Sequence, residues 1–489
     1  MILKIFFMLA LLYGALFLGA HAFEFLAFRI SGIQASDLDP ETYRTPDPDP
    51  ATNFYSVLEY DFSSSSKDNY SPRGLHDYYP IPGVHGRSSD GNFLPWPWDP
   101  DFSLFYDPQT VVDDGLERIQ QRGGNLPGKV TDAKSISSAK TPLEACEALI
   151  SPFRPFIQRL CSGLDRPESI NPLPYPKPFS PETPQLSVID LIRVAKLMNL
   201  ESLLGLAQEP PKMEVEPILV NLRLAQGMLD RPIGVLGQIG GLAITGITLP
   251  VIWKGCEESA LTTEELIRIQ NQLTKLNPVR DCLPAIMGSY SFQYQAVLSG
   301  GVLAEVYQVP KILLPILAPI LRGLLFLEVE KTRSVIGRGK RFMDEKDHFP
   351  FLEKLLWFWH IHWQGTFRSL QVYNDCVKTD LHVKLSRLDL AVELFKRKTG
   401  KVPESLGQLV PTVCQELPVD PLTGKAFGYK KTGPNEYVLY SWWVDQKDDG
   451  GTPVSFPPMN PEKGEENYKF MMDEAKGDLV WPRHRAGGN

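Results

Sequence analysis

The feature that most constrains this chain is an uncharged, strongly apolar run at its N-terminus, from Ile5 to Ala22. Lys4 is the cation that precedes the run, and apolar residues resume at Phe23 and Phe25. Eighteen helical residues extend about 27 Å at 1.5 Å per residue, close to the thickness of the hydrocarbon core of a bilayer. The run therefore predicts that residues 1–30 form a signal anchor, a single transmembrane helix.

A cleaved signal peptide is the alternative interpretation of the same run. Ala20, His21 and Ala22 match the small-x-small pattern at which signal peptides are cut. We prefer the uncleaved anchor because the run is long for a signal-peptide core and apolar sequence continues beyond it. In either case the body of the protein is expected to leave the cytoplasm, either tethered to the membrane or released from it.

Two further apolar stretches are not predicted to span a bilayer. Residues 232–253 contain no charged side chain and are rich in glycine. Gly237 and Gly241 have the G-x-x-x-G spacing of paired membrane helices. Gln238 within this stretch, and charged helical sequence on both sides, favour a buried helix of a bundle. Residues 312–321 are apolar but too short to span a bilayer.

Proline is unusually frequent in residues 31–185, in stretches such as 45–50 and 94–98. Because proline fixes φ and lacks a backbone donor, long helices and central strands are excluded from this region. We expect an extended Pro/Asp/Ser-rich arm whose aromatic side chains pack on the body, with short helices near 111–122 and 142–161. An aromatic-rich binding surface is the functional alternative.

Residues 186–385 are predicted to form an α-helical domain, because apolar residues recur there at the spacing i, i+3, i+4, i+7. This spacing occurs in two groups, first Val188, Leu191, Ile192 and Ala195, and then Ile218, Leu222, Ala225 and Leu229. Thr262 and Glu265 have the spacing of an N-terminal capping box before a further apolar stripe. Successive amphipathic helices must bury their stripes against one another, which predicts an antiparallel bundle or a short solenoid.

The charge of the chain argues against nucleic-acid binding, and its cysteines lack the spacing of a zinc site. The formal net charge is -8, which does not suit a general nucleic-acid binder. None of the six cysteines forms a C-x-x-C pair. In an oxidising compartment Cys146 could pair with Cys161, or Cys256 with Cys282, since each bond would close a modest loop. Buried small apolar side chains are the alternative interpretation.

No catalytic motif in the sequence satisfies the chemistry that it would have to perform. Residues 137–140 and 64–67 match S-x-x-K, and residues 398–400 and 431–433 match K-T-G, as in penicillin-binding enzymes. That chemistry needs K-T-G on an inner strand, whereas Lys398 ends a predicted helix and Lys431 lies in a predicted turn. Chance matching explains these patterns, and an exported hydrolase with an unrecognised site in residues 186–385 remains the enzymatic alternative.

Two polar features of the helical region have structural explanations as well as functional ones. His360 and His362, inside the aromatic segment 357–363, diverge by about 200° on a helix, which favours packing over joint metal ligation. Residues 331–341 carry five cations. These cations could contact anionic lipid headgroups, and a solvated loop is the default interpretation.

Residues 386–489 predict a small α+β module. A helix that ends at Gly400, a C-terminal cap, presents one apolar face formed by Leu385, Leu388, Val392 and Phe395. Two short strands follow at 427–430 and 437–441, joined by a turn, and residues 477–482 form a last strand. An acidic, glycine-containing loop at 445–451 separates the second strand from the last.

This order of elements resembles the globular half of the major pseudopilin of type II secretion systems. In that family a helix leads into a G-x-x-P-x-x-L-x-x-L segment, a P-x-D-P-x-x-G turn, a hairpin that ends in Tyr-Ser or a similar pair, and a loop rich in glycine and aspartate. The matching residues are Gly400, Pro403, Leu406, Leu409, Pro418, Asp420, Pro421, Gly424, Tyr429, Tyr440, Ser441, Asp445, Asp448, Gly450, Gly451 and Asp478. The match covers about a fifth of the chain.

The resemblance implies a small antiparallel sheet packed on a long helix, and a bound calcium ion. Calcium takes six to eight oxygen ligands, which closely spaced carboxylates and backbone carbonyls can supply. The ligands implied are Asp445, Asp448, Asp449 and Asp478. A solvated acidic turn is the alternative, since Trp442 and Gln446 stand where the family usually has glycine.

The sequence departs from a pilus subunit at its N-terminus. Pseudopilins begin with a glycine cut site and a glutamate at the fifth position, followed by the apolar helix. Gly19 and Glu24 have that separation here, but the long apolar run precedes them. The chain therefore looks like a larger anchored bacterial protein that carries a pseudopilin-like C-terminal domain.

The fold class expected from these observations is α+β, with a transmembrane helix, an extended Pro-rich arm, a helical bundle or short solenoid, and a C-terminal sheet module. The function expected is a non-enzymatic, single-pass scaffold of the bacterial cell membrane, with its body in the periplasm and protein partners in the envelope. It would act near a type II secretion or pilus-like apparatus. A periplasmic or secreted protein after signal cleavage, an exported hydrolase and a calcium-dependent surface binder are the alternatives.

Overall fold

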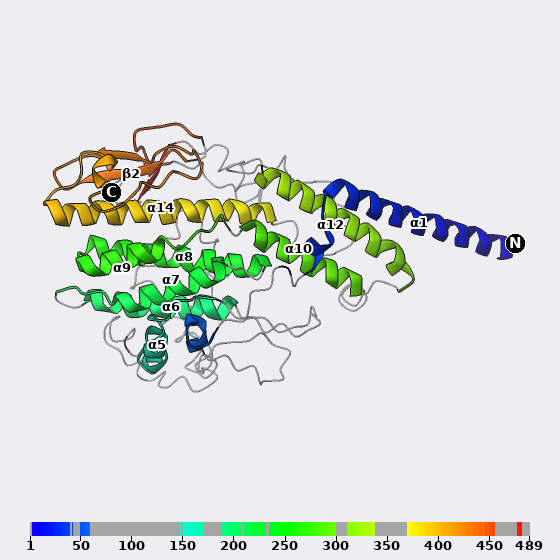
Figure 1. Cartoon of the computed structure of the whole chain (residues 1–489), viewed down its shortest axis with the longest axis horizontal. Coiled ribbons are helices and arrows are strands. Elements are labelled where there is room, and N and C mark those ends of the chain that lie inside the picture. Colours follow the sequence, from blue (N-terminus) through cyan, green and yellow to red (C-terminus); the bar gives the residue numbers. More distant parts are fainter. Residues whose placement is uncertain are drawn as a thin grey trace, which may run out of the picture.

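The described part of this computed structural model is mostly helical, with one small antiparallel sheet (Figure 1). The described residues are 2–39, 42, 49–58, 147, 150–170, 188–207, 210–230, 234–280, 282–299, 311–337, 369–443, 445–454 and 477–481. The sheet lies against one long helix at one end of the molecule, and the N-terminal helix projects from the other end (Figure 1). The expected combination of an apolar N-terminal helix, a helical body and a small C-terminal sheet is confirmed.

Helix α8 (Gly234–Glu257) is the centre of the body, and its buried residues occupy every face of the helix. The helices that enclose it are α6 (Val188–Leu204), α7 (Val215–Asp230), α10 (Cys282–Ser299) and α14 (Ser369–Thr399). By length and apolar composition, α8 and residues Ala10–Ser31 of α1 (Ile2–Ser31) could each cross a membrane. Because α8 is mostly buried inside the protein, the prediction of a core helix at residues 232–253 is confirmed.

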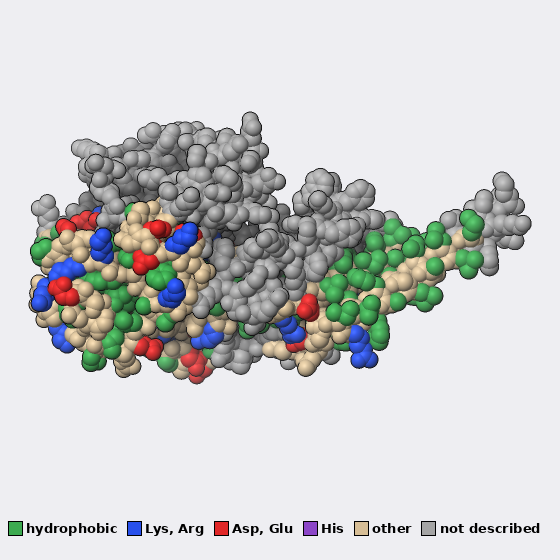
Figure 2. Space-filling model, turned by 90° about the horizontal axis from the view of Figure 1, so that it is seen from above, with side chains coloured by type: hydrophobic (Ala, Val, Ile, Leu, Met, Phe, Trp, Pro, Cys, Tyr) green, Lys and Arg blue, Asp and Glu red, His purple; other side chains and the backbone are tan. Residues whose placement is uncertain are grey.

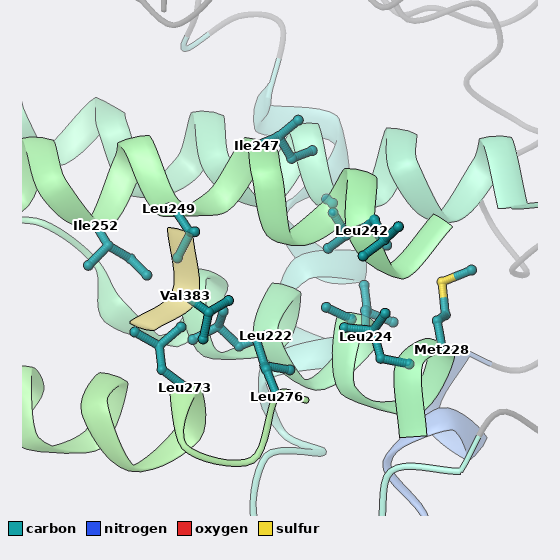
Figure 3. Close-up of a cluster of buried hydrophobic side chains, with 14 of the residues drawn as sticks. Leu222, Leu224, Met228, Leu242, Ile247, Leu249, Ile252, Leu273, Leu276 and Val383 are labelled. Carbon is teal, nitrogen blue, oxygen red and sulfur yellow. The ribbon is translucent and has the colours of Figure 1, made fainter. Parts of the chain in front are cut away.

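Two glycines bring α7 and α8 into close contact. A β-carbon on Gly240 would lie 2.3 Å from Met228 Cε, and one on Gly241 would lie 2.7 Å from Leu229 Cγ. Both distances are shorter than a van der Waals contact, so a larger residue at either position would push the helices apart. Figure 3 shows Leu224 and Met228 of α7 beside Leu242 of α8 in this tightly packed region.

The apolar stripes read from the sequence form the buried faces of α6, α7 and α9 (Thr263–Leu273). The predicted stripe of α7 is fully enclosed, with Ile218, Leu222, Ala225 and Leu229 all at 0% exposure. Helix α9 begins with the predicted capping box, in which the Glu265 amide donates to Thr262 Oγ1 at 3.3 Å and the Thr262 amide donates to Glu265 Oε2 at 2.7 Å. These predictions are confirmed.

A buried pair of asparagines fixes the relative positions of α6, α7 and α8. Asn221 Nδ2 donates to Asn199 Oδ1 at 2.8 Å and to the Ala195 carbonyl at 2.9 Å. Asn199 Nδ2 in turn donates to the Ile247 carbonyl at 2.8 Å. Buried amide groups are costly unless they are hydrogen-bonded, so this network favours one arrangement of the three helices over shifted ones.

The described parts of residues 31–185 pack on the helical body. They form four short helical elements: η1 (Ala35–Leu38), η3 (Phe54–Leu58), η6 (Ser151–Phe153) and α5 (Arg154–Cys161). Of these, η3 and α5 pack on α7, and η1 packs on α10. Arg223 of α7 donates to the carbonyls of Pro167 at 3.2 Å and Glu168 at 2.6 Å, and Tyr55 OH donates to the Leu224 carbonyl at 2.5 Å. The helix predicted near 142–161 is present in its second half, and the one predicted near 111–122 lies outside the described residues.

The C-terminal module consists of α14, η10 (Leu406–Leu409) and a sheet with strand order β1-β2-β3. The strands are β1 (Gly428–Lys431), β2 (Tyr437–Ser441) and β3 (Leu479–Trp481), and both pairings are antiparallel. Gly400 ends α14 with φ of +79°, as predicted for a C-terminal cap. Helix α14 runs through the predicted boundary at residue 386, so one continuous helix contacts both α8 and the sheet.

The predicted pairing of Cys256 with Cys282 does not form. These two residues lie on α8 and α10 and are not joined by a disulfide bond, and Cys161 is likewise a thiol. Cys146, its predicted partner, lies outside the described residues. Burial of small apolar side chains, the alternative interpretation, accounts for Cys256 and Cys282.

Helix α14 also carries two buried carboxyl groups within the body. Asp375 is 8% exposed, and burial raises its pKa to about 7 although Lys378 acts in the opposite direction. Burial likewise raises the pKa of Asp380, against the attraction of Lys384, whose Nζ lies 2.7 Å from Asp380 Oδ2. A protonated carboxyl group is therefore the favoured form of Asp375 inside the folded body near neutral pH.

The raised pKa of Asp375 predicts that the protein loses stability as the pH rises. The folded pKa of about 7 lies above the unfolded value of about 3.9. The stability that the group contributes is therefore complete below pH ~4 and is lost as the pH rises through ~7. We expect Asp375→Asn to raise the free energy of unfolding by up to about 4 kcal/mol at pH 8 and to change it little at pH 4.

Denaturant unfolding at both pH values measures this effect, with Asp165→Asn as the control because Asp165 is exposed. An Asp375→Asn effect of the same size at pH 4 and pH 8 would contradict the assignment.

Candidate functional site

The sheet module is organised around a turn that is built on a buried carboxylate, Asp420. Its Oδ1 accepts hydrogen bonds from the amides of Leu422 at 2.7 Å and Thr423 at 3.4 Å. The Gly424 amide donates to the Asp420 carbonyl at 2.7 Å, and Gly424 has φ of +69°, a conformation that favours glycine. The P-x-D-P-x-x-G residues therefore have a structural role, in which aspartate satisfies the turn amides and glycine closes the turn.

The Tyr440–Ser441 pair joins β2 to two different acidic groups. Ser441 Oγ donates to Asp420 Oδ2 at 2.7 Å, which ties the strand to the turn. Tyr440 OH donates to Asp448 Oδ1 at 3.1 Å, which ties the strand to the acidic loop. Burial and the neighbouring Asp448 carboxylate raise the pKa of Tyr440 to about 12. The tyrosine therefore remains a hydrogen-bond donor throughout the physiological pH range.

The acidic loop is shaped by its own backbone hydrogen bonds. Asp445 Oδ1 accepts from the Lys447 amide at 3.1 Å, and Asp448 Oδ1 accepts from the Gly450 amide at 3.0 Å. Gly450 and Gly451 both have positive φ, +67° and +80°, which an L side chain would resist. The loop thus turns back towards β3 in a conformation that depends on consecutive glycines.

Asp478 lies at the base of this loop and is fully buried. Its Oδ2 accepts a hydrogen bond from the Gly451 amide at 2.8 Å, whereas its Oδ1 has no hydrogen-bond partner among the described residues. Burial raises the pKa of Asp478 to about 6, the Gly451 amide opposes that shift, and the negative charges of Asp448 and Asp449 add to it. A buried carboxylate oxygen without a donor is a costly feature that a cation or water would relieve.

Of the four predicted calcium ligands, the structure brings three into electrostatic contact. The negative charges of Asp448 and Asp449 act on Asp478, whereas Asp445 accepts a local hydrogen bond from the Lys447 amide. Across the described part of the chain, no group of three Asp, Glu, His or Cys side chains is arranged to hold a metal ion. A calcium ion here would therefore bind the unpartnered Asp478 oxygen with one neighbouring carboxylate and would need backbone carbonyls to complete its shell.

A second candidate site, which the sequence did not reveal, lies where α1 meets α12 (Leu314–Gly337). Glu24 and Arg322 form a bidentate ion pair, with Oε2 and Nη2 at 2.9 Å, and their side chains are 18% and 12% exposed. Asp37, just after α1, pairs with Arg333 at 2.8 Å. Bidentate arginine–carboxylate pairs are geometrically specific, so the Glu24–Arg322 pair fixes α1 on α12, and the Asp37–Arg333 pair holds the segment that follows α1.

The remaining polar candidates have structural roles or lie outside the described residues. Lys398 Nζ donates to the Thr412 carbonyl at 3.3 Å, and Lys431, which is in β1 rather than in the turn, pairs with Glu404 at 2.6 Å. Both K-T-G matches therefore serve the fold of the sheet module. The two S-x-x-K matches, His360 and His362 lie outside the described residues.

Comparison of the sequence with models of known protein families gives no match, and neither curated proteins nor solved structures give one. The chemistry of the site is therefore argued from its own residues. The acidic loop offers oxygen ligands, and its Tyr440–Asp448 hydrogen bond, like the Ser441–Asp420 bond, ties β2 to a neighbouring segment. The α1–α12 pair offers attachment. Among the described contacts, these two places support binding and tethering better than a covalent reaction.

The Asp420 turn predicts a specific loss of stability. In Asp420→Ala the Leu422 amide and the Ser441 hydroxyl would lose a buried acceptor, and we expect a loss of about 2–3 kcal/mol in the free energy of unfolding. Ser441→Ala removes one neutral partner and should cost about 1 kcal/mol. Equilibrium denaturation, with amide hydrogen exchange over residues 418–425, measures both changes. An Asp420→Ala effect no larger than that of Ser441→Ala would overturn the role assigned to this carboxylate.

Proposed function

We propose that this protein is a non-enzymatic scaffold tethered to the membrane of a bacterial cell envelope by α1, with its body in the periplasm. The single observation that carries this proposal is the attachment of α1 to the body through the Glu24–Arg322 ion pair. Towards its N-terminus α1 extends beyond α12 and bears apolar side chains on its surface (Figure 2). An exposed apolar helix of this length is stable in a bilayer and unfavourable in water.

Contacts of α1 on the N-terminal side of the potential cleavage site favour the uncleaved anchor. Tyr13 OH donates to the Ile312 carbonyl at 2.8 Å, and Ala20 is 4% exposed. Cleavage after Ala22 would remove both residues from their contacts. Towards the N-terminus the side chains of Leu11 and Leu18 are 59% and 69% exposed, as expected for a segment that meets acyl chains.

The pseudopilin-like character of the C-terminal module is part of this proposal. It is supported by the order of the helix, the Asp420 turn, the hairpin and the acidic loop, and by the hydrogen bonds that give Ser441 and Tyr440 their roles. Glu24, at the fifth position from Gly19, is engaged by Arg322 of the same chain. The sheet also shares α14 with the body. Both features suit a scaffold beside a secretion or pilus-like apparatus better than a pilus subunit.

An exported hydrolase is the second candidate function, and Asp375 is the observation that favours it. A buried carboxyl group whose pKa is raised to about 7 is suited to general acid–base chemistry. Its immediate partner is Lys378, one turn along the same helix. Loss of a measurable hydrolytic activity in Asp375→Asn would favour this candidate over the scaffold.

The tether predicts that the full 55.0 kDa chain is recovered from the membrane fraction, and that detergent releases it whereas alkaline carbonate does not. A transmembrane helix resists extraction by high pH because its attachment is hydrophobic rather than electrostatic. Intact mass spectrometry gives the N-terminus. A mature chain that begins at Phe23, in the soluble fraction, would contradict the tether.

The scaffold role is tested by a truncation after Gly400, which leaves α14 complete and removes the sheet. Partners that copurify with the full chain should be lost from the truncated one while membrane recovery stays unchanged. Retention of every partner would sink the proposed role of the module.

Calcium binding predicts a stabilisation of the sheet module. A ligand that binds the folded state alone at 100 times its Kd stabilises that state by about 2.7 kcal/mol. We expect calcium, relative to chelator, to raise the unfolding temperature of the full chain in detergent. Asp478→Asn and Asp448→Asn should abolish the shift. Asp445→Asn is the matched control and should retain most of it, because the described contact of Asp445 is local. No shift in the wild-type chain would refute a calcium site.

A further inference from the structure

We propose that residues 312–321, the end of the short helix η8 (Lys311–Leu313) and the first turns of α12, enter the bilayer beside α1, so that lipid acyl chains cover a second segment of this protein. The inference rests on the proposed tether and specifies what else the membrane contacts. This segment is too short to span a bilayer. It would instead line the part of α1 nearest the body, within one leaflet.

The first argument is the parallel register of the two helices, in which residues 13, 24 and 28 of α1 lie beside residues 312, 322 and 326. The Ile312 carbonyl accepts from Tyr13 OH at 2.8 Å, near the middle of the apolar run. Further along, a β-carbon on Gly323 would lie 2.6 Å from the Phe23 ring, and the Phe28 and Phe326 rings are 5.3 Å apart. Figure 1 shows α12 beside the C-terminal half of α1.

This register determines the depth of α12. Tyr13 and Glu24 are separated by about 16 Å along the helix axis, at 1.5 Å per residue, roughly half of the ~30 Å hydrocarbon core. Tyr13 lies inside the uncharged run that α1 places in the bilayer. Because Ile312 is in contact with Tyr13, the start of this segment cannot remain in water while α1 spans the membrane at this depth.

The second argument is the composition of the segment. Residues 312–321 contain no charged or polar side chain. Ile316 and Leu321 are 8% and 7% exposed and pack inwards, whereas Ile312 is 69% exposed. A helix that is apolar on all sides is characteristic of a protein interior or a membrane.

The charges near this segment stand at its two ends. Arg322 follows the segment at the end nearest the body. Its charge is neutralised by Glu24 in the bidentate pair, at the level where the uncharged run of α1 ends. Lys311 precedes the segment and is exposed. This register brings Lys311 into the hydrocarbon core at the level of Tyr13, a costly position for an ammonium group. The uncharged residues 312–321 between the two cations therefore carry the argument for a membrane segment.

The test uses the full wild-type chain in vesicles of phosphatidylethanolamine and phosphatidylglycerol that contain a phospholipid with a photoreactive diazirine in its acyl chain. After illumination, mass spectrometry maps the modified residues. We expect adducts on Leu11–Leu18 of α1 and on residues 312–321. Ile267 of α9, an apolar side chain that is 45% exposed, is the internal control and should carry none.

The outcomes separate this inference from the tether. Adducts on α1 without any on residues 312–321 would overturn the inference and leave the tether standing. An absence of adducts on both helices would overturn the tether as well. Crosslinks between residues 312–321 of two copies, in place of lipid adducts, would show that a second copy covers this surface and would also overturn the inference.

A variant sharpens the test. Ile312→Asp places a charge at a position whose side chain is 69% exposed. It leaves the hydrogen bond from Tyr13 OH to the backbone carbonyl of residue 312 intact, so the fold should be retained. We expect adducts on residues 312–321 to fall several-fold while those on α1 stay unchanged. Leu236→Asp, at a residue of α8 that is 61% exposed, is the matched control and should change neither.

Discussion

The rest of the structure depends on the burial of α8, an apolar helix that is mostly enclosed by other helices. Such a helix is stable when other helices or a membrane cover its apolar faces. Here α6, α7, α10 and α14 cover it, and Gly240 and Gly241 allow a close approach to α7. Helix α10 then leads towards α12 and α1, while α14 carries the sheet at the other end of the molecule (Figure 1). Helix α1 and the sheet module are thus attached, through neighbouring helices, to the same buried element.

Polar groups inside the protein select among the arrangements that apolar packing alone would permit. The Asn199–Asn221 pair fixes three helices of the body, and Asp420 fixes the turn that precedes the sheet. Glu24 and Arg322 do the same for the anchor helix. Each group satisfies donors or charges that would be expensive to bury alone. Apolar contact therefore supplies most of the attraction, and a few hydrogen-bonded groups determine the geometry.

The features that could be predicted from the sequence are those encoded within a few residues. The apolar stripe of α7, the capping box of α9 and the glycine cap at Gly400 all depend on neighbours one or two turns away. The Glu24–Arg322 pair could not be predicted, because its partners are 298 residues apart and either charge alone is typical of a helix end. The acidic loop was located by resemblance, but the burial of Asp478 beneath it depends on how β3 returns to β2. The extent of α14 was also missed, since the change of pattern near residue 386 reflects a new packing partner rather than a new element.

The continuity of α14 has a mechanical consequence. With 31 residues the helix is about 46 Å long, and the described residues contain no linker between the part that packs on α8 and the part that packs on the sheet. The sheet therefore cannot swivel relative to the body without bending a helix. A force applied to the sheet along the axis of α14 is transmitted through the helix backbone to the core of the body. There many packed side chains oppose it together in shear, rather than one contact at a time. A protein built in this way transmits force from the sheet to its core as a stiff rod.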